Sequence, residues 1–359
     1  MKQMSTFVYD PTTADSQSKV RGIGRFVQTL KEVLPRDTVF TSDLTKIPYD
    51  SVFINPFINL IQPPLIAQRI AKKQIGIIHD IIPLQFPQHF PVGLRGKLNS
   101  WRNKKSLEHY DVIVTDSEAS KKHILNKLKV KSEKIKVIYP GLPRVFSNSE
   151  PEARNTKQTT NSDLKNSDLF RNSKFEIRNY FIYVGDVTWN KNLVNLAKAI
   201  KLGTLPCVFV GKTFTSTVPV NSWTSEFHEF VKLAKEDKRF SFPGFVSDDQ
   251  LKILYKNALA NVLVSREEGF GFSYVEASSQ KTPSILSDID IFHETAGETA
   301  LFVNHKDPES IAKAIKRLSE DGSLRTRVGQ KAFERWQSLP DSTAAWKLLL
   351  DSLQTPLSA

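Results

Sequence analysis

The stretch Ser265–Glu276, SREEGFGFSYVE, decides how this chain is interpreted. The apolar run Ala260–Val264 precedes it and the helix-compatible run Tyr274–Lys281 follows, so the sequence predicts a buried strand, a glycine-rich turn and a helix. In α/β proteins this arrangement points backbone N–H groups at a phosphate. Glu268 and Glu276 stand eight residues apart, where their carboxylates could accept hydrogen bonds from sugar hydroxyls. We therefore predict a site for a diphosphate sugar.

Each of the two carboxylates also has a purely structural interpretation. Ser273 and Glu276 have the spacing of a capping box, S-x-x-E, in which the Glu276 carboxylate only accepts from the backbone N–H of Ser273. Glu268, beside Glu267, could be a solvated loop acid. Both carboxylates together with two glycines at the exit of a strand favour the diphosphate-sugar site over these alternatives.

Length and composition predict a two-domain protein. The chain has 359 residues, long for a single core, and is 40% hydrophobic and 25% charged. It contains no run of 18 apolar residues, and its N-terminus lacks the apolar core of a signal peptide. The single cysteine, Cys207, lies in an apolar run and is expected to be a small buried side chain. These features predict a cytoplasmic protein.

Positive charge is concentrated in the first part of the chain. Residues 1–150 carry 23 Lys and Arg against 13 Asp and Glu, whereas residues 151–359 carry 27 against 25. Residues 95–136 alone hold 12 basic and 5 acidic residues and include WRNKKS (Trp101–Ser106). Such a patch attracts an anionic membrane surface or nucleic acid, although a solvated helix face explains it equally well. Nucleic acid ranks lower, because no nucleic-acid-binding motif accompanies the patch.

Short apolar runs alternate with helix-length amphipathic runs, which predicts mainly parallel sheets covered by helices. One predicted helix covers Pro64–Lys72. Residues 148–179, rich in Asn, Ser, Lys and Thr, interrupt the alternation and predict a linker or loop. We predict one domain over residues 1–147 and a second over 180–340, with a cleft between them at the carboxyl ends of the strands.

Two further glycine turns are candidate phosphate sites. Gly185–Asn192, GDVTWNKN, again joins a predicted strand to a helix, and Lys191 could hold a phosphate as a point charge. A lysine at the start of a helix is nevertheless common without such a role. Gly22 and Gly24 precede another helix-like run, where N–H groups could face an anion, but a lone GxG is a weak signal.

His79 follows the predicted strand Gln74–Ile78 and stands next to Asp80. It could transfer a proton or bind a hydroxyl, or it could be a structural histidine bonded to a nearby carbonyl. No His, Cys and Asp cluster has metal-ligand spacing, and the chain has no G-x-S-x-G elbow, Walker A loop or full G-x-G-x-x-G. These absences disfavour a hydrolase, an NTPase or a dehydrogenase.

In this order the segments resemble the large retaining glycosyltransferase family of the GT-B fold called glycosyltransferases group 1. The most specific part is Tyr180–Pro308, with the E-x7-E motif at Glu268 and Glu276. RGIGRFVQTL, HDIIPL and VTDSEASKKHIL match in the first half, and only residues 148–179 lie outside the resemblance. It implies two Rossmann-like domains facing a cleft, an acceptor site in the first, a nucleotide-sugar site in the second, and a C-terminal helix (about 341–359) that packs back on the first.

The resemblance also implies roles for particular residues. Glu268 would contact the donor sugar, Glu276 the ribose, Lys191 the diphosphate, and His79 would lie beside the reacting sugar. His79, Glu268 and Lys191 would be catalytic, and the donor-binding residues would be Gly22, Gly24, Gly185, Lys191, Phe245, Arg266, Glu268, Gly269, Phe270, Gly271, Phe272 and Glu276. Asp186 departs from the family, which often has a basic residue there, so Lys191 would carry more of the diphosphate charge or Arg266 would help.

The implied activity is that of a hexosyltransferase without metal or cofactor, acting in polysaccharide biosynthesis. It would move a sugar from a nucleotide-diphosphate donor to a hydroxyl of a glycan or lipid-linked acceptor. HDIIPL resembles mannosyltransferase members, which makes GDP-mannose the first donor to consider. The basic first domain predicts peripheral contact with the inner membrane face through residues 95–136, and no nucleic acid. The alternatives are a catalytically silent nucleotide-sugar binding protein and a GT-B-type epimerase or phosphorylase.

Overall fold

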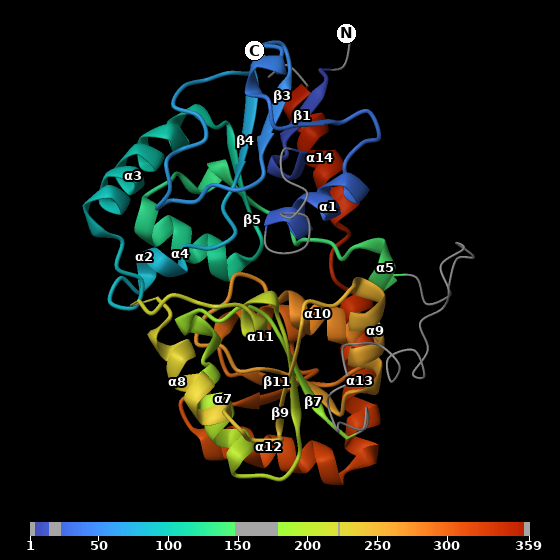
Figure 1. The fold of residues 1–359 in the computed structure, drawn as a ribbon. Coiled ribbons are helices and arrows are strands. Elements are labelled where there is room, and N and C mark those ends of the chain that lie inside the picture. Colours follow the sequence, from blue (N-terminus) through green and yellow to red (C-terminus); the bar gives the residue numbers. More distant parts are fainter. Residues whose placement is uncertain (1–3, 14–22, 148–178, 222, 355–359) are drawn as a thin grey trace. The chain divides into compact units, whose positions relative to one another are not determined.

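The computed structural model describes residues 4–13, 23–147, 179–221 and 223–354. They form two compact units, Met1–Pro143 with Pro340–Ala359 and Arg144–Leu339, each built on a six-stranded sheet (Figure 1). The segment predicted to be a linker lies outside the described residues except for Asn179. No helix in the described ranges combines the length and apolarity that a membrane span requires.

The first unit is a parallel sheet with strand order β2-β1-β3-β4-β5-β6. Its central strands β3, β4 and β5 are buried almost throughout, as their apolar runs predict. The strands are β1 Thr6–Tyr9, β2 Val39–Thr41, β3 Val52–Asn55, β4 Lys73–Ile77, β5 Val112–Thr115 and β6 Ile135–Val137. The helices are α1 Ile23–Val33, α2 Ile82–Gln85, α3 Gly93–Ser106, α4 Glu118–Leu128 and α14 Ser342–Gln354.

Helix α14 belongs to the first unit although it is the last helix of the described residues, and it contacts α1. Gly141 lies against the start of this helix, because a Cβ built on Gly141 would approach Ser342 Oγ to 2.6 Å. Only a residue without a side chain fits there unless the serine moves. The short helix α5 (Arg144–Ser147) belongs to the second unit and contacts α9 and α10.

The predicted helix at Pro64–Lys72 is wrong: these residues form an irregular loop. The Gln74 side chain accepts hydrogen bonds from the backbone N–H groups of Ile70 (2.7 Å) and Ala71 (3.0 Å) through Oε1. Arg69 donates to the backbone oxygen of Lys72 and to both oxygens of Asp111. Side chains therefore take the backbone groups that a helix would have paired with one another.

The second unit is also a parallel sheet, with strand order β12-β11-β10-β7-β8-β9. Its strands are β7 Phe181–Val184, β8 Cys207–Val210, β9 Phe240–Gly244, β10 Ala260–Leu263, β11 Ser284–Ser287 and β12 Leu301–Val303. Besides α5, its helices are α7 Leu193–Lys201, α8 Ser225–Ala234, α9 Asp248–Asn257, α10 Phe272–Ser279, α11 Asp290–Ala296, α12 Pro308–Glu320 and α13 Gly322–Gln337.

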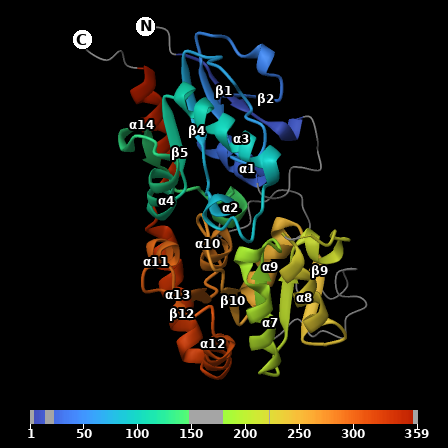
Figure 2. The same ribbon diagram turned by 90° about the vertical axis from the view of Figure 1, so that its left-hand side faces the viewer.

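The order of these strands reverses between β7 and β10. From β7 the chain proceeds outward through α7 to β8, and from β10 it proceeds the other way through α10 to β11. Because such crossovers are right-handed, α7 and α10 cover opposite faces of the sheet. Accordingly α7 packs with α8 and α12, whereas α10 packs with α9 and α13 (Figures 1 and 2). Ligands of open α/β sheets bind at such a reversal, beyond the carboxyl ends of the strands.

Candidate functional site

Two of the sequence-predicted segments leave neighbouring strands at this reversal. Gly185–Lys191 follows β7 and Ser265–Gly271 follows β10, and the two strands pair in parallel, with Phe181 opposite Ala260. Parallel pairing brings both carboxyl ends to the same edge of the sheet. The fold therefore brings together the two glycine turns that the sequence could only list separately.

The side chain of Glu268 lies inside this pair of loops. It is 9% exposed, and its Oε1 accepts hydrogen bonds from Lys191 Nζ (2.6 Å) and Ser265 Oγ (2.7 Å). The position of Ser265 is fixed in turn, because Ser287 Oγ donates to its carbonyl oxygen (2.6 Å). Glu268 is thus an oriented carboxylate with a paired ammonium group, and its interpretation as a solvated loop acid is wrong.

Asparagines hold the two loops together. Asn190 Nδ2 donates to the carbonyl oxygen of Glu267 (3.0 Å), and the N–H of Arg266 donates to the carbonyl oxygen of Asn190 (2.7 Å). Asn192 adopts a left-handed conformation (φ 58°), and its Nδ2 donates to Val264 O (2.9 Å). Asparagine tolerates this conformation better than most residues. Asn192 can therefore form the turn after Lys191 with its backbone and bind the neighbouring loop with its side chain.

Helix α10 begins directly after the second turn, with Gly271 as its N-cap. Gly271 has φ +88°, and a Cβ at this position would approach the ring of Phe292 to 2.8 Å, so the turn requires glycine on two grounds. No side chain caps this helix N-terminus. Its first N–H groups and the positive end of the helix dipole are suited to an anion.

The predicted capping box at Ser273 and Glu276 is wrong. Ser273 lies within α10 instead of preceding it, and Ser273 Oγ is buried without a hydrogen-bond partner among the described residues. Glu276 is 4% exposed, and its Oε2 accepts a hydrogen bond from Tyr255 Oη (3.0 Å) on α9. Glu276 therefore faces α9 and does not cap its own helix.

The turn after β7 holds Gly185 and Asp186. A Cβ at Gly185 would approach Tyr183 Oη to 2.7 Å, and Tyr183 Oη donates to the carbonyl oxygen of Asp186 (2.7 Å). The Asp186 Oδ1 atom accepts from the N–H of Val187 (2.8 Å) and from Thr213 Oγ1 (3.2 Å). The carboxylate that stands in place of a basic residue is thus bound by its own turn and by Thr213 of the turn after β8.

Arg266 is engaged by its neighbours. Its guanidinium lies 2.9 Å from both carboxylate oxygens of Glu226, donates to the backbone oxygen of Trp189, and lies over the indole ring with Cζ 4.9 Å from the ring centroid. Burial raises the pKa of the Glu226 carboxyl, and the nearby Arg266 opposes this rise. The positive charge of Arg266 is therefore neutralised by Glu226, whereas an arginine that binds a phosphate would need its charge for the phosphate.

The remaining predicted donor residues lie along the same two loops or at the next strand exits. Gly269 and Phe270 are buried, and the Phe270 ring meets that of Phe272 edge-on with centroids 5.5 Å apart. Phe245 follows β9 directly after Gly244, which has φ +73°, and the side chain is 46% exposed. Phe245 therefore stands at the same edge of the sheet, two strands away from β7.

In the first unit, His79 follows β4 and lies against Asp116, which follows the neighbouring strand β5. His79 Nδ1 is 2.7 Å from Asp116 Oδ2, and Nε2 is 3.1 Å from the carbonyl oxygen of Pro56. Burial lowers the pKa of His79, but Asp116, together with Asp80 and the Pro56 carbonyl, outweighs this effect, so the pKa is raised above its ordinary value. Both neighbours are acceptors, which suits a doubly protonated ring.

Aromatic rings and the chain entry complete the surroundings of His79. The ring of Phe26 meets the imidazole edge-on at 4.4 Å between centroids, and that of Phe57 stacks at 5.8 Å. Gly24 is buried in the first turn of α1, on the same helix as Phe26. Gly22 lies outside the described residues.

Sequence reasoning missed Asp116, Ser265 and Tyr255. Asp116 could have been found, because it directly follows a predicted strand, as His79 does, and the carboxyl ends of parallel strands meet. Ser265 precedes the motif carboxylate by three residues, a short enough separation for contact within one turn. Tyr255 carries no such signal, since its contact with Glu276 depends on how α9 packs against α10.

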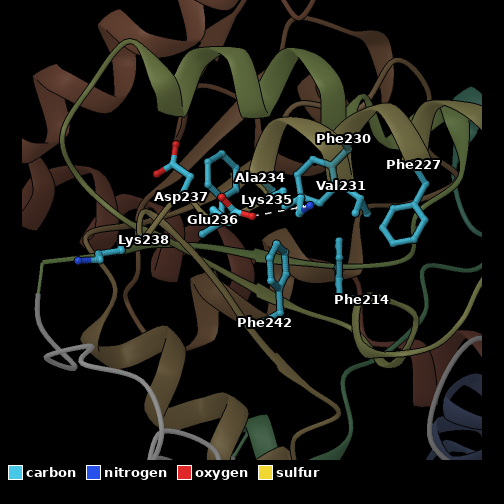
Figure 3. A pocket seen from close by; sticks show the side chains of 11 residues that line it. Phe214, Phe227, Phe230, Val231, Ala234, Lys235, Glu236, Asp237, Lys238 and Phe242 are labelled. Atoms are coloured by element: carbon cyan, nitrogen blue, oxygen red, sulfur yellow. Dashed lines mark ion pairs between the residues drawn. The ribbon is translucent and has the colours of Figure 1, made fainter.

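The described residues contain no group of three His, Cys, Asp or Glu side chains placed to hold a metal ion. A separate hollow of about 480 Å³ lies in the second unit and shares no residue with the predicted site (Figure 3). It is lined by aromatic rings of α8, β9 and the turn after β8, among them Phe214, Phe230 and Phe242. These rings pack on Phe209 in the core, so we interpret the hollow as the outer side of an aromatic cluster.

Comparison with known proteins agrees with this geometry. Residues 165–335 match the model of the family glycosyl transferases group 1. This match places residues 165–335 in the group 1 glycosyltransferase family. The family resemblance seen in the sequence is thereby confirmed, and the matched residues contain both loops of the site and the whole of α10.

Proteins similar to this chain include mannosyltransferases named for the O-antigen chain. RfbU of Salmonella typhimurium, an O-antigen chain mannosyltransferase, is 29% identical over 252 residues, 69% of this chain but only 62% of RfbU. O-antigen chain mannosyltransferase B of Escherichia coli is 22% identical over 77% of this chain and 71% of that protein. Among solved structures, HepE of Anabaena in complex with UDP-glucose superposes with a TM-score of 0.69 at 15% identity, over 98% of this chain and 99% of HepE. The predicted fold class, two Rossmann-like domains of the GT-B type, is confirmed.

Proposed function

We propose that this protein is a retaining glycosyltransferase that moves a sugar, with mannose as first candidate, from a nucleotide-diphosphate donor to a hydroxyl of a glycan or lipid-linked acceptor. The observation that carries the proposal is the cluster of Glu268, Lys191 and Ser265 at the strand reversal, beside the uncapped N-terminus of α10. The mannosyltransferase relatives support the choice of sugar. GDP-mannose follows as the first donor to test.

The cluster suits the charge changes of sugar transfer. As the bond to the leaving diphosphate breaks, positive charge builds on the sugar ring and negative charge on the diphosphate. The N-terminus of α10 and the Lys191 ammonium would stabilise the diphosphate, and groups held in place before the reaction need not reorganise during it. This arrangement supplies positive charge from the chain itself, so we propose that no metal or cofactor takes part.

Glu268 would bind the donor sugar through its second oxygen. Both of its hydrogen bonds go to Oε1, and no described residue donates to Oε2. A sugar hydroxyl could therefore donate to Oε2 without displacing Lys191. Glu276 would accept a hydrogen bond from a ribose hydroxyl, and Phe245 would contact the donor beyond β9. In the acceptor-side unit, His79 would lie beside the reacting sugar.

The test is nucleotide release across a panel of GDP-, UDP- and ADP-sugars, with and without an acceptor extract, using Glu268→Ala as the inactive control. Release that depends on one donor, and that rises with acceptor, supports a transferase. Binding of a nucleotide sugar without release would favour the silent binding protein, and isomerised donor or phosphate-dependent release would favour an epimerase or a phosphorylase. Activity that a chelator abolishes would contradict the metal-free proposal.

The positive charge of the first unit bears on which acceptor the enzyme would use. A lipid-linked acceptor at the inner face of an anionic membrane would explain why the excess of positive charge lies in residues 95–136. The proposal includes peripheral attachment there and excludes nucleic acid as a partner.

A further inference from the structure

Helix α3 (Gly93–Ser106, GLRGKLNSWRNKKS) has the reverse of the usual amphipathic pattern. In a helix that covers a sheet, apolar residues face the protein and polar residues face solvent. In α3 the buried residues are Gly96, Asn103 and Ser106, none of which has a large apolar side chain. The helix lies on the outer side of the first unit (Figures 1 and 2).

The face of α3 that meets the protein is attached by hydrogen bonds. Asn103 Nδ2 donates to the carbonyl oxygens of Asn59 (3.3 Å) and Gln62 (2.7 Å), and Asn99 Nδ2 donates to that of Ile61 (3.2 Å). These contacts fix the rotation of the helix about its own axis. The opposite face is consequently held toward solvent.

That solvent-facing side carries the large apolar residues of the helix. Leu94 is 86% exposed, Leu98 46% and Trp101 56%. Spacings of four and three residues align these side chains in one stripe over two turns. Lys105 continues the stripe, with Nζ 5.0 Å from the centroid of the Trp101 ring. A stripe of this kind exposed to water costs free energy, which burial would recover.

Positive charge borders the stripe on both sides. At about 100° per residue, Arg95 and Arg102 fall on one flank and Lys97 and Lys104 on the other. All four are exposed, and the helix contains no Asp or Glu. A surface that is apolar along its centre and cationic along both edges matches an acyl boundary with anionic headgroups above it.

We propose that α3 is a membrane-docking helix that lies in the plane of an anionic lipid surface, with Leu94, Leu98 and Trp101 inserted below the headgroups and the four flanking cations bound to them. The proposed function assigned the membrane contact to the positive charge of residues 95–136. Here the contact is assigned to helix α3, and it includes insertion of apolar side chains as well as electrostatic attraction. The inference rests on that contact but not on sugar transfer. Vesicle binding is measured without donor or acceptor, so either proposal can fail alone.

The experiment is co-sedimentation of the full chain with vesicles of phosphatidylcholine, alone or mixed with phosphatidylglycerol, and tryptophan fluorescence on the same samples. Wild type should bind the mixed vesicles, and a blue shift of emission should disappear in Trp101→Phe. The variant Leu94→Ser/Leu98→Ser/Trp101→Ser should bind at least about tenfold more weakly. Glutamine in place of a flanking cation should weaken binding about fivefold for each charge removed.

Matched controls place the same changes elsewhere. Leu202→Ser and Leu348→Ser remove leucines that are 62% and 72% exposed in the second unit and on α14, and both should bind like wild type. Replacing Lys121, Lys122 and Lys127 of α4 by glutamine tests charge within residues 95–136 but outside α3, and should weaken binding far less than the loss of as many α3 cations.

Four results would overturn the proposal. They are unchanged binding by the triple serine variant, a Trp101 emission that does not move, equal binding to vesicles of phosphatidylcholine alone, and a dimer in solution that the triple variant abolishes. The last result would make α3 an interface between copies. Circular dichroism of each variant identifies any loss of fold, which exposed positions should not cause.

Discussion

Each unit holds a mostly buried ion pair at the carboxyl edge of its sheet, His79–Asp116 in the first and Lys191–Glu268 in the second, and these two pairs differ in what they leave available. In the first unit, both ring nitrogens of His79 lie against acceptors, Asp116 Oδ2 and Pro56 O. In the second, Glu268 receives both of its hydrogen bonds at one oxygen, Oε1. The histidine is therefore saturated by the protein, whereas the glutamate retains an oxygen for a hydroxyl.

This difference assigns different work to the two pairs. An imidazolium whose N–H groups are both bonded can contribute its charge and its ring faces, but it is not placed to remove a proton. In Glu268 the protein holds one carboxylate oxygen by hydrogen bonds, which fixes the orientation of the carboxylate. The other oxygen can then accept a hydrogen bond from a ligand and orient that ligand. We therefore expect the second pair to govern sugar recognition and the first to set the electrostatics and shape of its surroundings.

The strongest way to break this comparison is to remove Glu268. Glu268→Ala should lower sugar transfer by about 10²–10³-fold, the usual effect of deleting one preorganised polar group at a reacting centre. Nucleotide affinity should change much less, because the diphosphate contacts that we propose come from α10 and Lys191. Steady-state transfer and nucleotide binding are measured together. Glu236→Ala, an 84% exposed acid paired with Lys235, is the control, and wild-type turnover in Glu268→Ala would refute the assignment.

The second prediction removes the cation of the same pair. Lys191→Met leaves the mostly buried Glu268 carboxylate without its ammonium partner and should destabilise the second unit by about 2–3 kcal/mol. Amide hydrogen exchange in β10 and α10 reports this loss locally. The double variant Lys191→Met/Glu268→Gln should regain part of it, because no buried charge is then unpaired. If the single and double variants exchange alike, the pair is not the stabilising interaction inferred here.

The third prediction concerns the first unit. A raised pKa means that His79 contributes stability below its ordinary pKa of 6.5, and that this contribution is lost as pH rises through the raised value. Asp116→Asn removes the carboxylate and should lower the pKa of His79, cost about 1–2 kcal/mol below pH 6.5, and flatten the pH dependence. NMR titration of His79 and amide exchange in β4 and β5 measure these changes. A His79 pKa unaffected by the substitution would show that Asp116 is not its partner.

The parallel sheets and the two glycine turns after β7 and β10 could be predicted from the sequence, because both depend on local patterns. Apolar runs such as Cys207–Val210 identify buried strands, and the S-x-x-Q spacing of Ser247 and Gln250 matches the capping box that the structure shows at the start of α9. Glu268 and Lys191 were each recognised beside a glycine turn. Their contact needed the strand order, because nothing local states that β7 and β10 are neighbours.

The wrong predictions depend on distant contacts and backbone conformations that local sequence patterns do not show. Gln74 takes the N–H groups that would have made Pro64–Lys72 a helix. Ser273 matches a capping box by spacing, but Gly271, with φ +88°, starts the helix earlier and places Ser273 inside it. The exposure of the apolar stripe of α3 could not be predicted, because a pattern of apolar positions does not show which face of a helix meets the protein. Asn99 and Asn103 decide that through distant carbonyls.

The smallest effect that we predict is that of Tyr255→Phe on nucleotide affinity. It tests whether Glu276, like Glu268, takes part in ligand binding. Tyr255→Phe deletes the hydroxyl that donates to Glu276 Oε2 and should cost about 1 kcal/mol of stability. Tyr180→Phe is a matched control, since Tyr180 Oη is buried in the same unit and donates to a backbone oxygen, that of Leu254. Both variants should lose similar stability, but only Tyr255→Phe should alter nucleotide affinity, by about two- to fivefold, measured by calorimetry with ribose and 2′-deoxyribose nucleotides. Equal affinities for the two variants would make Glu276 a packing residue and leave Glu268 as the carboxylate that binds the donor.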